Sequence, residues 1–383
     1  MNEEKPGKGL STSGVSLMGS MDQAGYGCTD TPPEPGHDRP GYILCDWVDD
    51  FIDTPAGPVP RVKTELTVRD RVSTGVVRCG INRYQYTVVP GLYAVGQPDA
   101  GSEVVVTANF KLTFDMVRTA LKGLNIWILV LDTRGINVWC AAGKGTFSTG
   151  ELVYRIENSE LAGVVDHKRV IVPQLGATGV SAKEVKTRSG FRVVYGPVRA
   201  SDIPGFLENN RKAAPEMREV TFTMGERFIL TPVEVQIVLK PALITALVLF
   251  ILSGFGPGIF SFGAAWTRGW TGLGAMAAGI ISGAVVTPVL LPFIPVKEFA
   301  LKGIITGCVT AVILLAALPA AGFVNGLALF LFTVTISSFL AMNFTGTTPF
   351  TSPSGVEKEM KRYIPAQLAC LVLSTGFWIY GAF

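Results

Sequence analysis

A cysteine stands just past the end of a buried strand. The apolar run NIWILVLD (residues 125–132) predicts that strand, and the segment NVWCAAGK (residues 137–144), which contains Cys140, follows after a glycine-containing turn. A cysteine in this position can pack as a small apolar side chain, act as a nucleophile beside a base, or bind a soft metal centre through its thiolate. The two histidines, His37 and His167, bring no recognisable catalytic pattern. Packing and metal ligation both stay open, and spacing alone does not choose between them.

The other cysteines provide no ligand set. All six cysteines occur singly, without a CxxC pair, so neither a zinc site nor an iron–sulfur cluster is expected within the chain. The formal net charge of +3 is too small to indicate nucleic-acid binding. We therefore expect no nucleic acid among the partners.

The elements that would position Cys140 alternate between strand and helix. Short β-rich runs at 103–109, 125–132, 169–175 and 191–197 are followed by amphipathic stretches at 111–123, 148–165, 181–190 and 200–212. This alternation is typical of an α/β domain with a parallel, doubly wound sheet. Ligands of such sheets bind in the crevice at the carboxyl ends of the strands. We expect the segments that follow the strands to meet there.

The chain divides into four regions. Residues 1–40 are rich in Gly, Pro, Ser and Asp and predict a disordered tail; residues 41–225 contain the α/β domain, 226–240 a linker, and 241–383 an apolar part. Crossing a bilayer needs roughly 17–25 helical residues. Five segments reach that length: 241–262, 270–294, 299–321, 323–343 and 364–383. The pairs Gly279 with Gly283 and Gly303 with Gly307 are spaced for close packing of these helices.

Basic residues set the expected orientation of the five helices. If the α/β domain is cytoplasmic, seven Lys and Arg residues near helix ends are inside and only Arg268 is outside, in keeping with the positive-inside rule. The seven are Arg227, Lys240, Lys297, Lys302, Lys358, Lys361 and Arg362. We expect a multi-pass protein of the inner (cytoplasmic) membrane, with the N-terminal domain cytoplasmic and the C-terminus outside. No ionisable residue falls at mid-membrane depth, so an anchor or docking platform is favoured over a transporter.

The segment around Cys140 resembles a known signature. All eight residues of NVWCAAGK match the motif Asn, Val or Ile, Trp, Cys, Ala or Ser, Ala, Gly, Lys of the HgcA family, the membrane-anchored corrinoid proteins of the microbial mercury-methylation pair. The resemblance covers nearly the whole chain, because that family joins a Rossmann-like corrinoid-binding domain to a transmembrane domain of five helices. Flanking stretches are similar to the corrinoid domain of the corrinoid iron–sulfur protein of the acetyl-CoA pathway. They are VPGLYAVGQPD (89–99), VVVTANFKLTFD (104–115), PQLGATGVSA (173–182) and YGP (195–197).

The resemblance implies a cobalamin bound base-off. Residues 137–144 would form a short cap helix under its lower face, with Cys140 as cobalt ligand and catalytic residue. Asn137 and Trp139 would hold the cap, Ala141 and Ala142 would allow its close approach, and Gly143 would end it. Lys144 either favours the thiolate or is a solvated surface lysine. The residues implied as cofactor-binding are Asn109, Lys111, Thr113, Asn137, Val138, Trp139, Cys140, Ala141, Ala142, Gly143, Lys144, Gln174, Leu175, Gly176, Ala177, Thr178, Gly179 and Val180.

The reaction implied by the resemblance is methyl transfer from methylcobalamin to Hg(II) in an anaerobe. Because Hg(II) is an electrophile, the methyl group must leave with its electrons, and a thiolate ligand on the opposite side of the cobalt favours that departure. The implied partners are a ferredoxin-like protein with two 4Fe–4S clusters as electron donor, and a methyl-folate or a methyl donor protein. Two alternatives stay open: a membrane-anchored corrinoid methyl carrier of one-carbon metabolism, and a transporter with a cytosolic regulatory domain.

Overall fold

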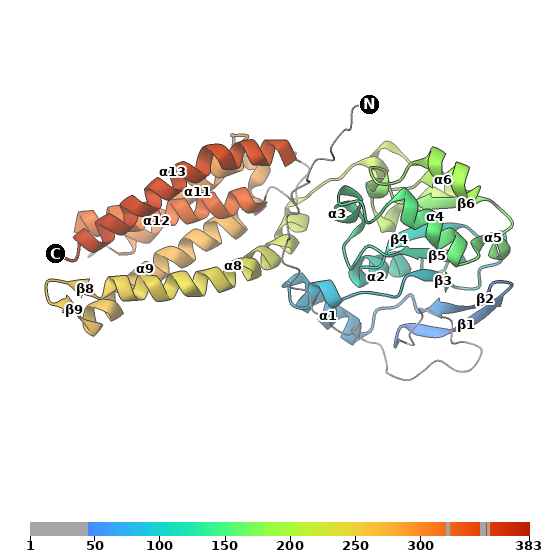
Figure 1. Cartoon of the computed structure of the whole chain (residues 1–383), viewed down its shortest axis with the longest axis horizontal. Helices are drawn as coiled ribbons and strands as arrows, with labels where there is room; N and C mark the ends of the chain where they lie inside the picture. Colours follow the sequence, from blue (N-terminus) through green and yellow to red (C-terminus); the bar gives the residue numbers. More distant parts are fainter. Residues whose placement is uncertain (1–44, 319–321, 345–349, 351–352) are drawn as a thin grey trace, which may run out of the picture.

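The computed structural model describes residues 45–318, 322–344, 350 and 353–383. It consists of a sheet domain and a bundle of long helices, which helix α8 joins (Figure 1). The predicted tail, residues 1–40, lies outside the described residues.

A seven-stranded sheet, counted over the described residues, forms the centre of the domain in the order β1-β2-β3-β5-β4-β6-β7. Its strands are β1 (Val48–Thr54), β2 (Gly57–Val62), β3 (Gly91–Val95), β4 (Val104–Ala108), β5 (Ile126–Leu131), β6 (Arg169–Val172) and β7 (Arg192–Tyr195). β5, β4, β6 and β7 are parallel neighbours, as the alternation of strands and helices predicts. β3 instead runs antiparallel to β5, and β1 antiparallel to β2. The sheet is therefore mixed, and its parallel half carries the expected strands.

Helices cover both faces of the parallel half (Figure 1). The helices of the domain are α1 (Val68–Arg78), α2 (Lys111–Ala120), α3 (Val138–Gly143), α4 (Thr149–Asn158), α5 (Leu161–Val164), α6 (Ala182–Ser189) and α7 (Ile203–Glu208). Side chains of α3 to α6 pack in one core cluster, and those of α2 and α7 pack in a second cluster on the other face. β4 and β5 are buried along their whole length, because a strand covered by helices on both sides has apolar residues on both faces.

The first part of the domain differs from the expectation. The sequence patterns do not predict β1, β2, β3 or α1. β1 has the sequence VDDFIDT and is partly exposed, so its three aspartates obscure the strand pattern. α1 is opened by a capping box between Thr67 and Asp70. The predicted helix at 148–165 is two helices, because Glu160 between them has a left-handed backbone with φ of 46°.

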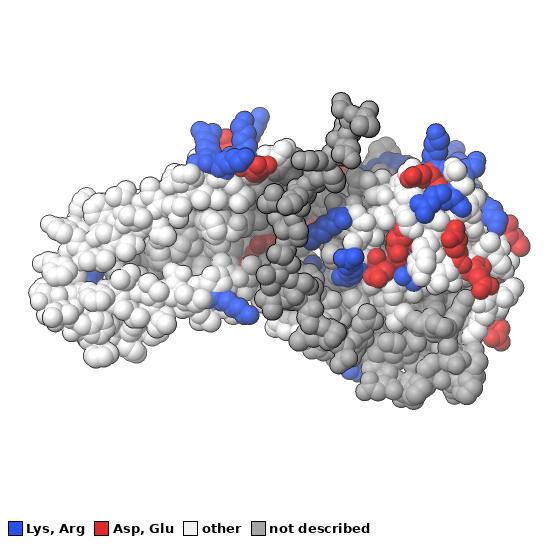
Figure 2. All heavy atoms as spheres, viewed as in Figure 1, with Lys and Arg blue, Asp and Glu red and all other residues white. Residues whose placement is uncertain are grey.

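Five helices within the described residues are long and apolar enough to cross a membrane, which agrees with the predicted number. They are α8 (Met224–Ser253), α9 (Phe262–Ile281) with its continuation through a π-helical segment (Ser282–Val286) and α10 (Thr287–Val289), α11 (Phe299–Ala316), α12 (Gly322–Asn343) and α13 (Pro353–Tyr380). On the face seen in Figure 2, the bundle carries charged side chains at few places, whereas many lie over the sheet domain.

The predicted linker at 226–240 is helical. α8 begins at Met224 and runs without a break into the first long apolar segment. A capping box between Thr223 and Glu226 opens α8, and the helix continues through Pro232 and Pro241. The sheet domain and the bundle are therefore joined by a helix.

The second apolar helix, α9, also begins before its predicted start at residue 270. It begins at Phe262, which places Arg268 inside the helix. A cation is tolerated there because its guanidinium donates a hydrogen bond to the carbonyl oxygen of Trp378 and lies 4.6 Å from the centre of the Trp378 ring.

The spaced glycines pack where the sequence predicts close helix contacts. A Cβ atom added at Gly303 of α11 would lie 2.6 Å from the carbonyl oxygen of Ser337 in α12, and one added at Gly283 would lie 2.5 Å from the same atom. Only glycine allows these backbones to approach so closely.

Candidate functional site

A cavity of about 970 Å³ lies at the carboxyl ends of β4, β6 and β7. The chain passes from β4 to β5 on one side of β4 and returns to β6 on the other side, so the segments that follow β4 and β6 diverge there. Ligands of open parallel sheets bind at such a switch point. The cavity thus occupies the expected crevice.

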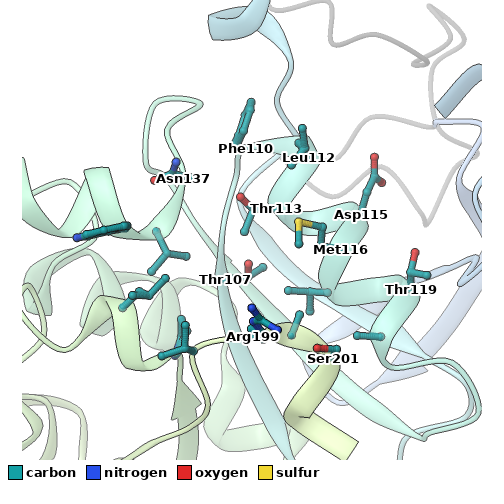
Figure 3. A pocket seen from close by; sticks show the side chains of 18 of the residues that line it. Thr107, Phe110, Leu112, Thr113, Asp115, Met116, Thr119, Asn137, Arg199 and Ser201 are labelled. Atoms are coloured by element: carbon teal, nitrogen blue, oxygen red, sulfur yellow. The ribbon is translucent and has the colours of Figure 1, made fainter. Parts of the chain in front are cut away.

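Apolar side chains make up most of the cavity wall. Phe110, Leu112 and Met116 come from the end of β4 and from α2 and lie on one side of the space in Figure 3. Ile229, Leu230 and Val233 come from α8. The first long helix of the bundle therefore completes a cavity that the sheet domain begins.

Thr107 is a polar residue inside this wall (Figure 3). It lies on β4, is 1% exposed, and its side-chain oxygen has no hydrogen-bond partner within the part of the chain that the structure describes. Burying a polar group without a partner costs on the order of 1–3 kcal/mol. The Thr107 hydroxyl is therefore an unsatisfied polar group of the cavity wall.

The segment around Cys140 forms a short helix, α3, at the edge of the cavity. Asn137 precedes α3, and its Oδ1 accepts a hydrogen bond from the backbone N–H of Cys140 at 2.9 Å. Asn137, Val138 and Trp139 line the cavity. The helix ends at Gly143. A short helix is therefore present at the residues for which the resemblance implies one.

α3 has an inner and an outer face. Val138, Ala141 and Ala142 are buried in the core of the domain. The outer face carries Trp139, which is 37% exposed, together with half-buried Cys140 and exposed Gly143. The contacts of Ala141, Ala142 and Trp139 therefore differ from those that the resemblance implies. The two alanines pack toward the sheet, and Trp139 does not anchor α3 in the core.

Cys140 is a free cysteine beside the cavity. It is not among the residues that line the cavity, but its neighbour Trp139 is. Within the described ranges, no three His, Cys, Asp and Glu side chains come together as a metal-binding group.

Asn109 fixes the turn that leads into α3. Its Oδ1 accepts hydrogen bonds from the backbone N–H groups of Thr133 and Gly135, each at 3.0 Å, and from the Thr133 hydroxyl at 2.8 Å. Its Nδ2 donates to Asp132 at 3.2 Å. Asn109 is 5% exposed and does not line the cavity. Its contacts position the segment that carries Cys140.

Lys111 lies in a buried ion-pair network. Its Nζ is 2.9 Å from Asp70 and 2.8 Å from Asp115, and Arg118 binds the same two carboxylates. Burial alone would raise the pKa of Asp70, but the hydrogen bond and charge of Lys111, the Thr67 backbone N–H and the charge of Arg118 outweigh burial and lower this pKa to about 2. These contacts occupy the Lys111 ammonium, which does not line the cavity.

The small residues of the loop after β6 make contacts within the protein. A Cβ atom added at Gly176 would lie 2.4 Å from the Phe147 ring, and one added at Gly179 would lie 2.1 Å from the Phe147 carbonyl oxygen. Gln174 accepts a hydrogen bond from Arg218 at 2.5 Å, and the Val180 carbonyl accepts one from Tyr195 at 2.6 Å. The loop is therefore held close to the segment that follows α3.

The other candidates from the sequence are divided between cavity and surface. Thr113 and Leu175 line the cavity. Lys144 and Thr178 are exposed, and Ala177 is half-buried. The exposure of Lys144 agrees with a solvated lysine.

Several cavity residues were not predicted. They are Thr107, Arg78, Arg83, Arg199 and the α8 residues Glu226, Ile229, Leu230 and Val233. The sequence TMGE at 223–226 is a capping-box pattern that marks the start of α8 and so could have placed its residues on a helix. The two arginines of α1 and the turn after it had no such pattern.

Comparison with known proteins places relatives on this part of the chain. Residues 82–207 match a family model described as the CO dehydrogenase/acetyl-CoA synthase delta subunit. The chain is 38% identical over 124 residues to the acetyl-CoA decarbonylase/synthase complex subunit gamma of Methanopyrus kandleri, which covers 32% of this chain and 26% of the relative. The subunit gamma of Archaeoglobus fulgidus is 34% identical over 125 residues, 32% of this chain and 26% of that protein. In Methanocaldococcus jannaschii, the subunit gamma is 34% identical over 130 residues, 33% of this chain and 26% of that protein.

The chain thus spans about a quarter of the length of these curated relatives. The family match contains β4 to β7 and α3, and it ends before α8. It confirms the part of the resemblance that concerns proteins of the acetyl-CoA pathway.

Proposed function

We propose that the sheet domain binds a corrinoid at the carboxyl ends of β4, β6 and β7, and that the Cys140 thiolate would hold its cobalt. The finer proposal is that the chain transfers a methyl group from this cofactor to Hg(II). The observation that carries the proposal is the outer face of α3, which presents a free thiol beside a large cavity within the eight-residue signature.

The chain's own residues fit such a cofactor. The cavity volume of about 970 Å³ is at the upper end of the usual range for cofactor sites. Most of its wall is apolar, and the Thr107 hydroxyl in that wall has no partner among the described residues. The printed names of the relatives, subunits of acetyl-CoA decarbonylase/synthase complexes, support a role in one-carbon chemistry.

Each residue near α3 has a role that follows from its contacts. A bound corrinoid would supply a methyl group carried on cobalt. Asn109 orients the turn before α3, and Asn137 holds its first turn by accepting the Cys140 N–H. Ala141 and Ala142 set the depth of α3 on the core. These contacts fix the backbone from which the Cys140 thiolate would reach the metal.

A methyl carrier of one-carbon metabolism is the second candidate. The names of the relatives favour it, because they place the matched domain in acetyl-CoA complexes. The signature NVWCAAGK favours the mercury reaction. Both candidates need a protein partner that supplies electrons, for which we propose a ferredoxin-like protein with two 4Fe–4S clusters. Both also need a methyl-folate or a methyl donor protein.

Purified full-length protein in detergent tests the proposal under anaerobic conditions. The protein is loaded with methylcobalamin, Hg(II) is added as a thiol complex, and methylmercury is measured against methylcobalamin alone. We expect formation above the protein-free rate, and a loss of at least about 100-fold in Cys140→Ala. Cys79→Ala, a change at an exposed free cysteine of the same domain, is the control and should keep the activity. Tight corrinoid binding without methylmercury would instead support the methyl carrier.

We further propose that the five long helices cross the cytoplasmic membrane with the sheet domain on the cytoplasmic side. Arg227 and Lys302 support this orientation. Arg227 donates to the Val289 carbonyl at 2.9 Å, and Lys302 donates to the Leu291 and Ile294 carbonyls at 2.7 Å each. Both cations thus lie at the end of the bundle that carries the start of α8, as the positive-inside rule requires for a cytoplasmic domain.

A further inference from the structure

Five charged residues line the cavity, and only some of them form ion pairs. They are Arg78, Arg83, Asp115, Arg199 and Glu226. Asp115 binds Lys111 and Arg118, and Arg199 forms an ion pair with Glu226 at 2.6 Å. Arg78 and Arg83 form no ion pair and donate no side-chain hydrogen bond within the described part of the chain. The α1 end of the cavity therefore carries two guanidinium groups without an ion-pair partner among the described residues.

The two free arginines lie close enough to repel each other. Burial first, and then the charge of Arg83, lower the pKa of Arg78. The Arg83 guanidinium lies 5.2 Å from the centre of the Phe110 ring, which also lines the cavity and holds the cation by a cation–π contact. Glu234 of α8 interacts with Arg83 only at longer range, without an ion pair. Because two half-buried cations lie this close to each other, an anionic ligand between them would be favourable.

We propose that Arg78 and Arg83 form a phosphate-binding subsite of the cavity and bind the phosphodiester of the nucleotide tail of the corrinoid. The inference rests on the proposed function. A guanidinium presents parallel N–H donors that match two oxygens of a phosphate. A base-off corrinoid has a nucleotide tail whose phosphate must be placed away from the cobalt. α1 and the turn after it would hold that phosphate, and α3 would hold the metal side.

Corrinoids that differ only in the tail test the subsite. Full-length protein in detergent is titrated with cobalamin, with cobinamide, which lacks the phosphate and the nucleotide, and with cobinamide phosphate. Quenching of tryptophan fluorescence gives the dissociation constants. We expect cobalamin and cobinamide phosphate to bind at least about tenfold more tightly than cobinamide, since charge-assisted hydrogen bonds are the strong ones. This comparison needs no variant.

The double variant Arg78→Gln/Arg83→Gln should remove the difference. Its affinity for cobalamin should fall at least about tenfold, whereas its affinity for cobinamide should stay within about twofold. Arg71→Gln, at an exposed position of the same helix outside the cavity, is the matched control and should behave as the wild type.

The outcomes separate the two proposals. Equal binding of cobalamin and cobinamide by the wild-type protein would overturn the phosphate subsite and leave corrinoid binding intact. An unchanged preference for cobalamin in the double variant would also overturn it. If the wild-type protein binds none of the three corrinoids, the proposed function fails, and the subsite assignment fails with it.

Discussion

Lys111 and Cys140 both follow strand ends, but their surroundings give them different roles. Lys111 is 1% exposed and neutralised by two aspartates, whereas Cys140 is a half-buried free thiol on the outer face of α3. Losing one partner of a buried ion pair commonly costs about 3–5 kcal/mol. Lys111 therefore contributes mainly to the stability of the domain, and Cys140 is available for ligand chemistry.

The network around Lys111 predicts a dependence of stability on acid pH. Because the pKa of Asp70 is about 2 in the folded protein and the usual value of this carboxyl is 3.8, its contribution to stability is complete above about pH 4 and is lost as the pH falls toward 2. We expect it to amount to about 2 kcal/mol. Thermal unfolding of the full-length protein between pH 5 and pH 2 measures it.

The variant Asp70→Asn should be less stable at pH 5 and should lose less stability than the wild type below pH 4. Asp49→Asn, which removes an exposed ion pair with Arg61, serves as control and should keep the wild-type slope. Equal slopes for the wild type and Asp70→Asn would contradict the assignment of the acid sensitivity to this network.

The loop after β6 packs against α3 and the segment that follows it, so a larger residue in this loop should displace α3. Gly179→Ala would force a Cβ atom against the Phe147 carbonyl oxygen, and its distance to the Ala142 Cα would be 3.2 Å. Overpacking of this kind typically costs about 1–3 kcal/mol. We expect a lower unfolding temperature and weaker corrinoid binding, because α3 must move. Circular dichroism and a corrinoid titration measure the two effects.

Gly75→Ala is the matched control for this loop. Gly75 lies inside α1, and an added Cβ atom there meets no atom within 4 Å. Replacing a helical glycine by alanine stabilises a helix by up to about 1 kcal/mol. The control should therefore be neutral or stabilising, and a loss in Gly75→Ala as large as that in Gly179→Ala would argue against a specific contact at Phe147.

The parallel half of the sheet could be predicted because its local pattern is unambiguous. The runs at 103–109 and 125–132 are apolar on both faces, and they form β4 and β5 almost within those bounds. Contacts between distant segments could not be predicted. The resemblance implies that Gly176 and Gly179 contact the cofactor, and the fold brings Phe147 against both glycines. The spacing of Ala141 and Ala142 likewise does not tell which face of α3 points to the core.

The start of α8 also differs from the prediction. The sequence predicts the first apolar helix at 241–262 and a linker at 226–240. The helix nevertheless forms from Met224, since Thr223 and Glu226 satisfy its first N–H groups and Arg199 of the sheet domain binds Glu226. Pro232 and Pro241 remain inside it.

Because α8 forms part of the cavity wall, a fragment of the chain should need the start of α8 to bind the corrinoid tightly. A fragment of residues 1–240 keeps Ile229, Leu230 and Val233 and should bind one corrinoid. A fragment of residues 1–222 lacks that wall and should bind at least about tenfold more weakly, because apolar surface of the ligand stays in water. Equal affinities of the two folded fragments would show that α8 does not complete the site.

Five crossings predict that the two ends of the protein lie on opposite sides of the membrane. Reporter fusions should place the N-terminus in the cytoplasm and the C-terminus at Phe383 outside, because the part of the chain that the structure describes contains five long apolar helices, an odd number. Fusions that place both ends on one side would contradict the five crossings.

The cobalt ligand of the loaded protein tests the proposed function most directly. X-ray absorption at the cobalt edge is measured on full-length protein with bound corrinoid, for the wild type and for Cys140→Ala. Because Cys140 is half-buried, the variant should stay folded, with a cost of no more than about 1 kcal/mol. We expect a sulfur neighbour of cobalt in the wild type and none in the variant. Cobalt with only nitrogen or oxygen neighbours in the wild type, and an unchanged spectrum in Cys140→Ala, would contradict the thiolate ligand.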